Sequence, residues 1–196
     1  MKPKFYTGVG SRETPDDIKD IMTRVARALG AQGWILRSGH ARGADKAFEA
    51  GAPAGKRRIY VPNSTFERPQ NADCLTPKET FGLIPWLKAM EMACDHHPAG
   101  RNLSHDHRQL HGRNVFQLLG DDLKTPSSFL LCWAPLPRFD EEGRVVDVDG
   151  GTGTTVRMAA TFKVPVYHLG IPEHLQKIEA FLEKQAPIPP GRTPKP

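Results

Sequence analysis

Phe5-Tyr6-Thr7-Gly8-Val9-Gly10-Ser11-Arg12 is a short apolar run that ends in glycine, serine and arginine. A run of this length, bounded by turn residues, is typical of a buried strand in a parallel sheet. A helix is expected directly after it, because Thr14 suits the N-cap, Pro15 suits the first turn, and apolar residues follow at helical spacing to Leu29. The stretch therefore predicts a strand, a glycine-containing turn and a helix.

The same order of strand and helix recurs along the chain. Strands are expected at residues 34–38, 58–61, 129–133 and 164–168, and helices at residues 44–51, 107–119, 150–160 and 175–182. Alternation of strands and helices with short connections implies parallel strands joined by right-handed crossovers. The predicted fold class is α/β, with a Rossmann-like parallel sheet flanked by helices in three layers.

Two segments depart from this alternation. Residues 62–106 are rich in Pro, Asn, Thr and His, with one amphipathic piece around residues 83–94, and we expect an irregular insertion laid over the sheet edge. Residues 135–148 combine Pro, Asp and Glu with alternating valines, which predicts a small hairpin or lid. We expect one nucleotide-binding domain over residues 1–185 and a loose, proline-rich tail over residues 186–196.

The composition argues against several classes of protein. Hydrophobic residues make up 38% and charged residues 25% of the 196 residues, a balance that argues against wholesale disorder. No apolar run reaches the roughly 18–20 residues of a membrane helix, the first residues lack a secretory signal, and no membrane partner is expected. Three widely spaced cysteines, Cys74, Cys94 and Cys132, are poor material for disulfides, so we expect a cytoplasmic protein.

Three turns share one design, in which a strand ends, glycine and hydroxyl residues follow, and a helix begins: residues 7–12, 38–45 and 149–155. In a parallel sheet such turns lie together at the carboxyl edge, where ligands bind. Glycines let the backbone approach a phosphate, helix-start N–H groups favour an anion, and the net charge of +5 favours phosphate-bearing partners. The candidate ligand-binding residues in these turns are Gly8, Gly10, Ser11, Arg12, Ser38, Gly39, Arg42, Gly43, Asp45, Gly150, Gly151, Thr152, Gly153, Thr154 and Thr155.

The sequence gives weaker evidence for other kinds of binding site. Neither G-x-x-x-x-G-K-[ST] nor a full G-x-G-x-x-G occurs, so we expect no P-loop hydrolysis, no standard dinucleotide site and no cofactor. Six side chains that bind metals in other proteins crowd one stretch: Cys94, His96, His97, His105, His107 and His111. Their spacing fits no standard zinc site, so we expect a solvated histidine-rich loop without a metal, with His111 near the ligand cleft. Trp86 and Trp133 are expected to pack in the core rather than to stack on bases.

The first two turns resemble a known family. Residues 7–12, ending in G-S-R, together with residues 37–49, containing S-G-x-A-R-G-x-D, are similar to the Rossmann-like core of the DNA-processing family DprA (Smf). The later Leu110-His111-Gly112-Arg113-Asn114 and Gly150-Gly151-Thr152-Gly153-Thr154 are more similar to LOG (lysine-decarboxylase-like) proteins, in which an Arg-bearing helix precedes a G-G-x-G-T turn.

Both families belong to the SLOG superfamily, and the resemblance covers roughly residues 5–61 and 107–170. It implies binding of nucleotides, nucleotide derivatives or single-stranded DNA at this sheet edge, and it implies a homodimer. It also implies that Arg113, which matches the functional arginine of the LOG family, is the catalytic candidate. The neighbouring Asn114 is a candidate to contact the same ligand, and the alternative is that it caps a neighbouring loop.

One departure bears on catalysis. LOG-type phosphoribohydrolases carry acidic residues just after the G-G-x-G-T turn, whereas this chain has Val156 and Arg157 there. Cleavage of a glycosidic bond through an oxocarbenium-like state needs a carboxylate, for which Asp45, Asp149 or Glu49 would have to substitute.

Three hypotheses about the ligand follow from the sequence. The leading one is binding of a nucleotide or a nucleotide-derived small molecule. The alternative is DprA-like binding of single-stranded DNA, and the second alternative is LOG-like hydrolysis of a nucleoside monophosphate.

Overall fold

The computed structural model describes residues 3–185, and the proline-rich tail expected at residues 186–196 lies outside this range. One sheet of six strands has the order β4-β3-β2-β1-β5-β8, and each neighbouring pair is parallel. Its strands are β1 (Lys4–Gly10), β2 (Trp34–Ser38), β3 (Arg57–Tyr60), β4 (Cys74–Leu75), β5 (Leu130–Trp133) and β8 (Val166–His168). The predicted parallel sheet is confirmed.

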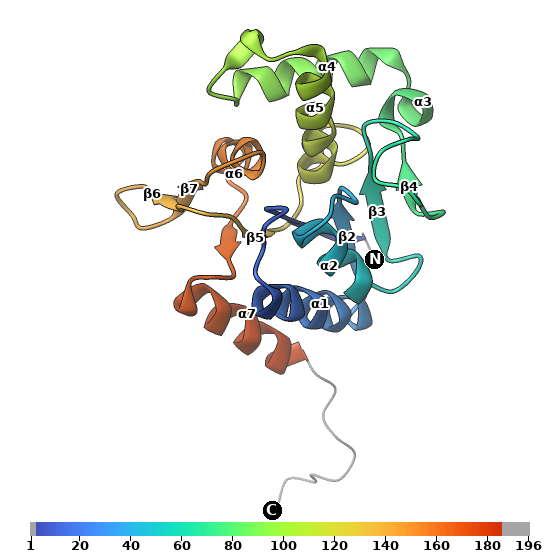
Figure 1. Ribbon diagram of the computed structural model, residues 1–196. Coiled ribbons are helices and arrows are strands. Elements are labelled where there is room, and N and C mark those ends of the chain that lie inside the picture. The colour runs from blue at the N-terminus through green and yellow to red at the C-terminus, as the bar shows by residue number, and fades with distance from the viewer. Residues whose placement is uncertain (1–2, 186–196) are drawn as a thin grey trace, which may run out of the picture.

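Helices fill the connections between the strands (Figure 1). They are α1 (Asp16–Ala31), α2 (Ala44–Gly51), α3 (Pro77–Phe81), α4 (Leu83–Asp95), α5 (His105–Leu119), α6 (Thr152–Thr161) and α7 (Pro172–Gln185), with a single 3-10 turn η1 (Gly100–Asn102) before α5. The segment after β5 forms the antiparallel hairpin of β6 (Arg138–Phe139) and β7 (Val145–Asp147), as the alternating valines predicted.

The strands are buried on both faces because helices cover both sides of the sheet (Figure 1). Side chains alternate across a strand, so Leu130 and Leu131 of β5 enter different cores. Leu131 packs with residues of α1, α2 and α7, whereas Leu130 packs with residues of α5 and α6, with α4 outside α5. This is the three-layer arrangement that the sequence predicted.

The insertion has more regular structure than its composition suggested. It adds β4 to the edge of the sheet next to β3, and it contains the 13-residue helix α4, whose Trp86 is 3% exposed. Burial of one face of α4 against α5 accounts for the amphipathic spacing seen in the sequence.

Helix α1 does not have the predicted N-cap residue, Thr14. The helix begins at Asp16, with Pro15 at the N-cap position and no side-chain cap. The Thr14 hydroxyl instead donates to the Ser11 carbonyl at 2.7 Å. Thr14 therefore stabilises the turn after β1 rather than the helix end.

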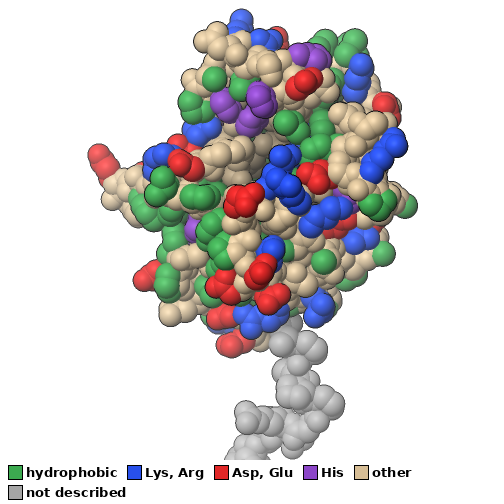
Figure 2. Space-filling model, in the orientation of Figure 1, with side chains coloured by type: hydrophobic (Ala, Val, Ile, Leu, Met, Phe, Trp, Pro, Cys, Tyr) green, Lys and Arg blue, Asp and Glu red, His purple; other side chains and the backbone are tan. Residues whose placement is uncertain are grey.

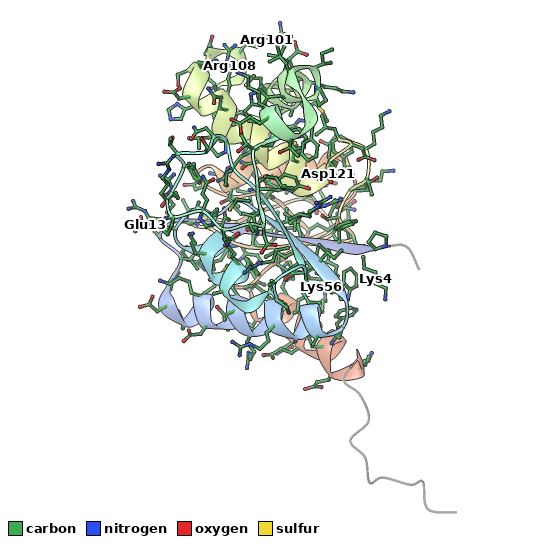
Figure 3. The ribbon with its side chains drawn as sticks, turned by 90° about the vertical axis from the view of Figure 1, so that its right-hand side faces the viewer. Lys4, Glu13, Lys56, Arg101, Arg108 and Asp121 are labelled. Atoms are coloured by element: carbon green, nitrogen blue, oxygen red, sulfur yellow. The ribbon has the colours of Figure 1, made fainter. Side chains whose placement is uncertain are left out.

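All six strands point the same way, so the turns that follow them gather at one end of the sheet. Figure 3 shows Lys4 and Lys56, at the start of β1 and before β3, at one end, and Glu13, after β1, at the opposite end. The chain runs from β1 toward β4 and then returns to β5 on the other side of β1. The carboxyl ends of β1 and β5 form the crevice where an open α/β sheet binds ligands.

No helix within residues 3–185 is both long enough and apolar enough to cross a membrane.

A methyl group at Gly10 should destabilise the sheet at this crevice. Gly10 pairs with Trp133, and a Cβ at Gly10 would lie 2.5 Å from the Trp133 carbonyl oxygen and 2.6 Å from the Ala44 Cβ. Because strand backbone cannot move aside cheaply, we expect Gly10→Ala to lower the free energy of unfolding by about 1–3 kcal/mol in urea titrations. Gly151→Ala is the matched control, since its Cβ would meet only His111 Cε1, at 3.8 Å. Equal stability of the two variants would contradict this account.

Candidate functional site

A cavity of about 940 Å³ opens at the carboxyl ends of β1 and β5. This volume is near the upper end of the roughly 300–1,000 Å³ typical of small-molecule pockets. In Figure 2 the surface is hollowed between a group of histidine side chains and a group of basic side chains. The pocket therefore lies where the three glycine-containing turns were expected to meet.

Eleven of the predicted site residues line this pocket, and they come from all three turns and from α5. They are Gly10, Ser11, Arg12, Arg42, Asp45, Arg113, Asn114, Gly150, Gly151, Thr152 and Thr155. Arg12 and Arg42 are exposed, whereas Asp45 and Arg113 are buried. Convergence of these segments in one cavity is the arrangement that the sequence argument required.

Six other predicted residues do not line the pocket: Gly8, Ser38, Gly39, Gly43, Gly153 and Thr154. They serve the packing of the turns instead. The Ser38 hydroxyl donates to the Gly8 carbonyl at 2.7 Å, which joins β2 to β1. A Cβ at Gly43 would lie 2.5 Å from the Ser11 carbonyl oxygen, so glycine lets the second turn pack directly on the first.

Arg113 of α5 reaches across the carboxyl ends of the strands to the second turn. It is 8% exposed, and its Nη1 donates to the Gly39 carbonyl, with Asp45 Oδ2 and the Tyr60 carbonyl each 3.5 Å away. The ring of Phe66, from the insertion, lies 5.0 Å from the guanidinium carbon. A Cβ at Gly39 would occupy the position of this guanidinium. Glycine at residue 39 therefore makes room for Arg113.

Burial opposes the charges of this ion pair. It raises the pKa of Asp45 and lowers the pKa of Arg113, and each partner offsets part of the effect on the other. The Ala41 N–H also donates to Asp45 Oδ2, at 3.4 Å. The buried Asp45 carboxylate therefore uses its Oδ2 within the protein, with the Ala41 N–H before α2 and with Arg113.

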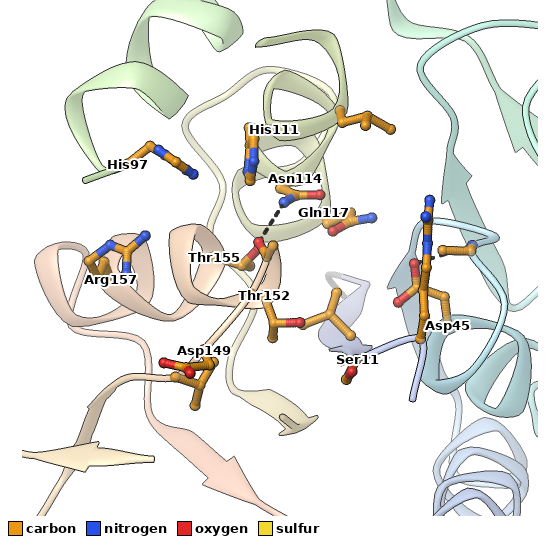
Figure 4. A pocket seen from close by; sticks show the side chains of 18 of the residues that line it. Ser11, Asp45, His97, His111, Asn114, Gln117, Asp149, Thr152, Thr155 and Arg157 are labelled. Atoms are coloured by element: carbon orange, nitrogen blue, oxygen red, sulfur yellow. Dashed lines mark hydrogen bonds between the residues drawn. The ribbon is translucent and has the colours of Figure 1, made fainter. Parts of the chain in front are cut away.

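The third turn differs from the second because no other segment packs closely against its first glycine. Gly150 has φ of 77°, a left-handed conformation that favours glycine, and a Cβ there would meet nothing within 4 Å. Helix α6 begins at Thr152 with no side-chain cap and no acidic residue in its first turn. Asn114 reaches this turn from α5, its amide 3.4 Å from the Gly151 carbonyl (Figure 4).

The hairpin and α6 contribute charged residues that the sequence argument did not assign to the site. Arg138 pairs with Asp147 at 3.1 Å and with Asp149 at 2.6 Å, and Arg157 pairs with Asp147. Arg157 Nε also donates to the His96 carbonyl at 2.6 Å. LOG hydrolases carry an acidic residue just after the G-G-x-G-T turn. Arg157 stands there in this chain, and it connects α6 to the hairpin through Asp147 and to the insertion through the His96 carbonyl.

His111 lines the pocket, where the sequence analysis expected it, but it is only 7% exposed and is not part of a solvated loop. His97, His107 and His111 all line the pocket, and the His97 and His111 rings are 4.5 Å apart between centroids. His105, at the start of α5, is exposed and does not line it. The insertion folds back over α5, and this long-range packing is what carries His97 to the cavity.

Gln117 was also missed, although a signal was present. His111, Asn114 and Gln117 follow one another at intervals of three, so they share a face of α5. Polar side chains at this spacing, within a helix that is buried from residue 111 to residue 119, indicate a face turned toward a polar cavity.

The carboxylates considered for catalysis lie in two places. Asp45 and Asp149 line the pocket, each beside an arginine, whereas Glu49 does not line it and accepts from His40 Nδ1 at 2.7 Å. Within residues 3–185, no three His, Cys, Asp or Glu side chains are placed to hold a metal ion.

No protein-family model and no curated protein matches this sequence. A solved structure does match, with a TM-score of 0.54 and 18% identity over 93% of this chain and 80% of the other. This chain has a fold similar to that of DNA processing protein A from Helicobacter pylori. The structure of that protein is described by its unique mode of binding single-stranded DNA. The DprA-like fold expected from the first two turns is confirmed, and the LOG-like interpretation of the third turn stays a prediction.

His111 should make the protein less stable in mild acid. Burial, together with His97, His107 and two arginines, lowers the pKa of His111 from 6.5 to about 4. Between these values the unfolded chain binds a proton that the folded chain does not, so stability falls as the pH drops from about 6.5 to 4. We expect His111→Gln to remove part of this loss, on the order of 2 kcal/mol, in urea titrations at pH 7 and pH 4.5.

The exposed His105→Gln variant is the control and should lose as much stability in acid as the unmodified protein. The same acid loss in His111→Gln and in the unmodified protein would contradict the assignment of a neutral, buried His111.

Proposed function

We propose that the pocket binds a nucleotide or a nucleotide-derived small molecule. The observation that carries the proposal is a set of four pocket-lining side chains, each at least nine-tenths buried, with a polar atom that has no hydrogen-bond partner within residues 3–185. The atoms are His111 Nδ1, Arg113 Nε, Gln117 Nε2 and Thr155 Oγ1. An unsatisfied buried polar group costs about 1–3 kcal/mol, and a bound polar ligand is a reason for a cavity to keep several of them.

The start of α6 suits the phosphate better than the start of α2. In α2 the Ala44 N–H donates to the Ser11 carbonyl, the Lys46 N–H donates to the Ala41 carbonyl, and Asp45 adds a negative charge. The first turn of α6 has no acidic residue and no side-chain cap, and Thr155 adds a hydroxyl. The Gly153 N–H of α6 donates to the Gly150 carbonyl at 3.1 Å, and neither helix has a side-chain cap, so the difference lies in the charge of the first turn. Without an acidic residue there, the helix dipole favours an anion at α6.

The remainder of the lining suits a sugar and a base. Carboxylates accept hydrogen bonds from sugar hydroxyls, and Asp45, Asp147 and Asp149 all line the pocket. These carboxylates would repel an anion that had no such hydroxyls. The mixture of acidic and basic side chains therefore favours a ligand with a charged phosphate and a hydroxyl-bearing sugar.

Two neighbouring threonines give a sharp test. Thr154 and Thr155 are both buried, and both have an unpartnered Oγ1, but only Thr155 lines the pocket. We expect Thr155→Val to weaken nucleotide binding about tenfold, which corresponds to about 1.4 kcal/mol, without lowering the melting temperature. Calorimetry with the common nucleoside monophosphates and diphosphates measures the affinity.

Thr154→Val is the control and should bind as the unmodified protein does. The absence of binding to every nucleotide of the panel, or equal weakening in both variants, would reject the proposal.

A second candidate function is binding of single-stranded DNA. The similarity of fold to DNA processing protein A, the net charge of +5, and the exposed Arg12 and Arg42 at the pocket favour it. Arginines at the mouth of the pocket would contact phosphates on either side of a nucleotide held inside it.

Arg12 and Arg42 should then determine the salt dependence of DNA binding. We expect affinity for oligo(dT) to rise with length and to fall steeply with salt, and the slope of log K against log[salt] to drop by about one unit in Arg42→Ala. Fluorescence anisotropy at several salt concentrations measures it. Arg24→Ala is the control, because Arg24 pairs with Glu179 of α7 at 2.9 Å. A mononucleotide that competes as well as a long oligonucleotide would reject this second candidate.

A further inference from the structure

One part of the pocket has a composition unlike the rest. His97, Pro98 and Leu103 of the insertion meet three residues of α5, His107, Leu110 and His111, and we call these six residues the histidine lobe. In Figure 4, His97 and His111 lie across the cavity from Asp45. The lobe contains no carboxylate, lysine or arginine, whereas the opposite wall contains Asp45 and Arg113.

The two inner imidazoles of the lobe are neutral. The Ala99 N–H donates to His97 Nδ1 at 3.0 Å, so the proton of the neutral His97 ring is on Nε2. Burial, with Arg157 and His107 as further causes, lowers the pKa of His97. His111 has a pKa of about 4 for the same kind of reason. A neutral ring offers one donor and one acceptor, and His111 Nδ1 has no partner within the described residues.

These properties match one kind of chemical group. Aromatic rings and apolar side chains bind flat, uncharged groups, and neutral imidazole nitrogens hydrogen-bond to the edge of such a group. Arg157 lies beside His97 but is paired with Asp147, so a phosphate or a carboxylate would lose its hydration here without gaining a free charged partner. A heteroaromatic base has the flat faces, the polar edge and the lack of charge that the lobe requires.

The lobe adjoins the start of α6. A Cβ at Gly151 would be 3.8 Å from His111 Cε1, so the third turn and the lobe are in contact. Thr152 and Thr155 continue the same wall of the pocket. A single nucleotide is therefore long enough to place its phosphate at the helix start and its base in the lobe.

We propose that the histidine lobe is the subsite for the base of the bound nucleotide, and that His111 determines which base is accepted. The inference rests on the nucleotide-binding function proposed above. It gives the insertion a role in specificity, because His97, Pro98 and Leu103 all come from it.

Calorimetry with the four common nucleoside 5′-monophosphates and with ribose 5-phosphate tests the inference. The unmodified protein should bind one base at least tenfold more tightly than the others and than ribose 5-phosphate, which has no base. His111→Leu keeps the bulk and removes the hydrogen-bonding edge, so the preference among bases should shrink to less than threefold while ribose 5-phosphate binds unchanged. His105→Leu, on the same helix but outside the pocket, should keep the full preference.

Leu103→Trp provides a second variant that does not alter a helix. Leu103 follows η1, and a larger side chain there should fill the lobe and weaken binding of the nucleotides at least tenfold more than binding of ribose 5-phosphate.

The possible failures are distinguishable. If ribose 5-phosphate binds as tightly as every nucleotide, or if His111→Leu keeps the preference, the lobe is not the base subsite although the phosphate site remains. If neither the nucleotides nor ribose 5-phosphate bind, the nucleotide-binding function itself is rejected, and this inference is rejected with it.

Discussion

The buried ion pair between Arg113 and Asp45 holds the two halves of the pocket together. Arg113 comes from α5 on one face of the sheet, and Asp45 comes from the start of α2 on the other. A buried guanidinium needs its partners, and Arg113 finds them in Asp45 and in the Gly39 carbonyl. Apolar residues of α5 pack in the core, this contact joins the helix to the second turn, and the same helix presents His111 and Gln117 to the cavity.

Three turns of similar sequence have become structurally different. The first two pack against each other, so the backbone N–H groups of Ala44 and Lys46 are used within the protein. The third packs beside the cavity, and the first turn of α6 has no acidic residue, whereas that of α2 has Asp45. Similar glycine-rich sequences therefore serve close packing in one place and an open helix end in another, because their neighbours differ.

Arginine–carboxylate pairs around the cavity bear on the hydrolase hypothesis. Asp45 lies beside Arg113, Asp149 beside Arg138, and Asp147 between Arg138 and Arg157. In each of these pairs a guanidinium already lies against the carboxylate oxygens that would have to accept the proton of an attacking water. This geometry does not favour the hydrolase hypothesis.

The sequence alone determined the α/β class, the parallel sheet and the three turns, because strand and helix periodicity and glycine-containing turns are local patterns. It also placed Arg12, Arg42, Asp45 and Thr152 at one edge, since parallel strands bring their carboxyl ends together, and the resemblance to LOG proteins pointed to Arg113. Only the tertiary structure decided that Gly39 makes room for an arginine and that His97 reaches the pocket from the insertion. Both depend on contacts between segments that are far apart in the chain. These contacts determine whether a glycine faces a ligand or a neighbouring side chain.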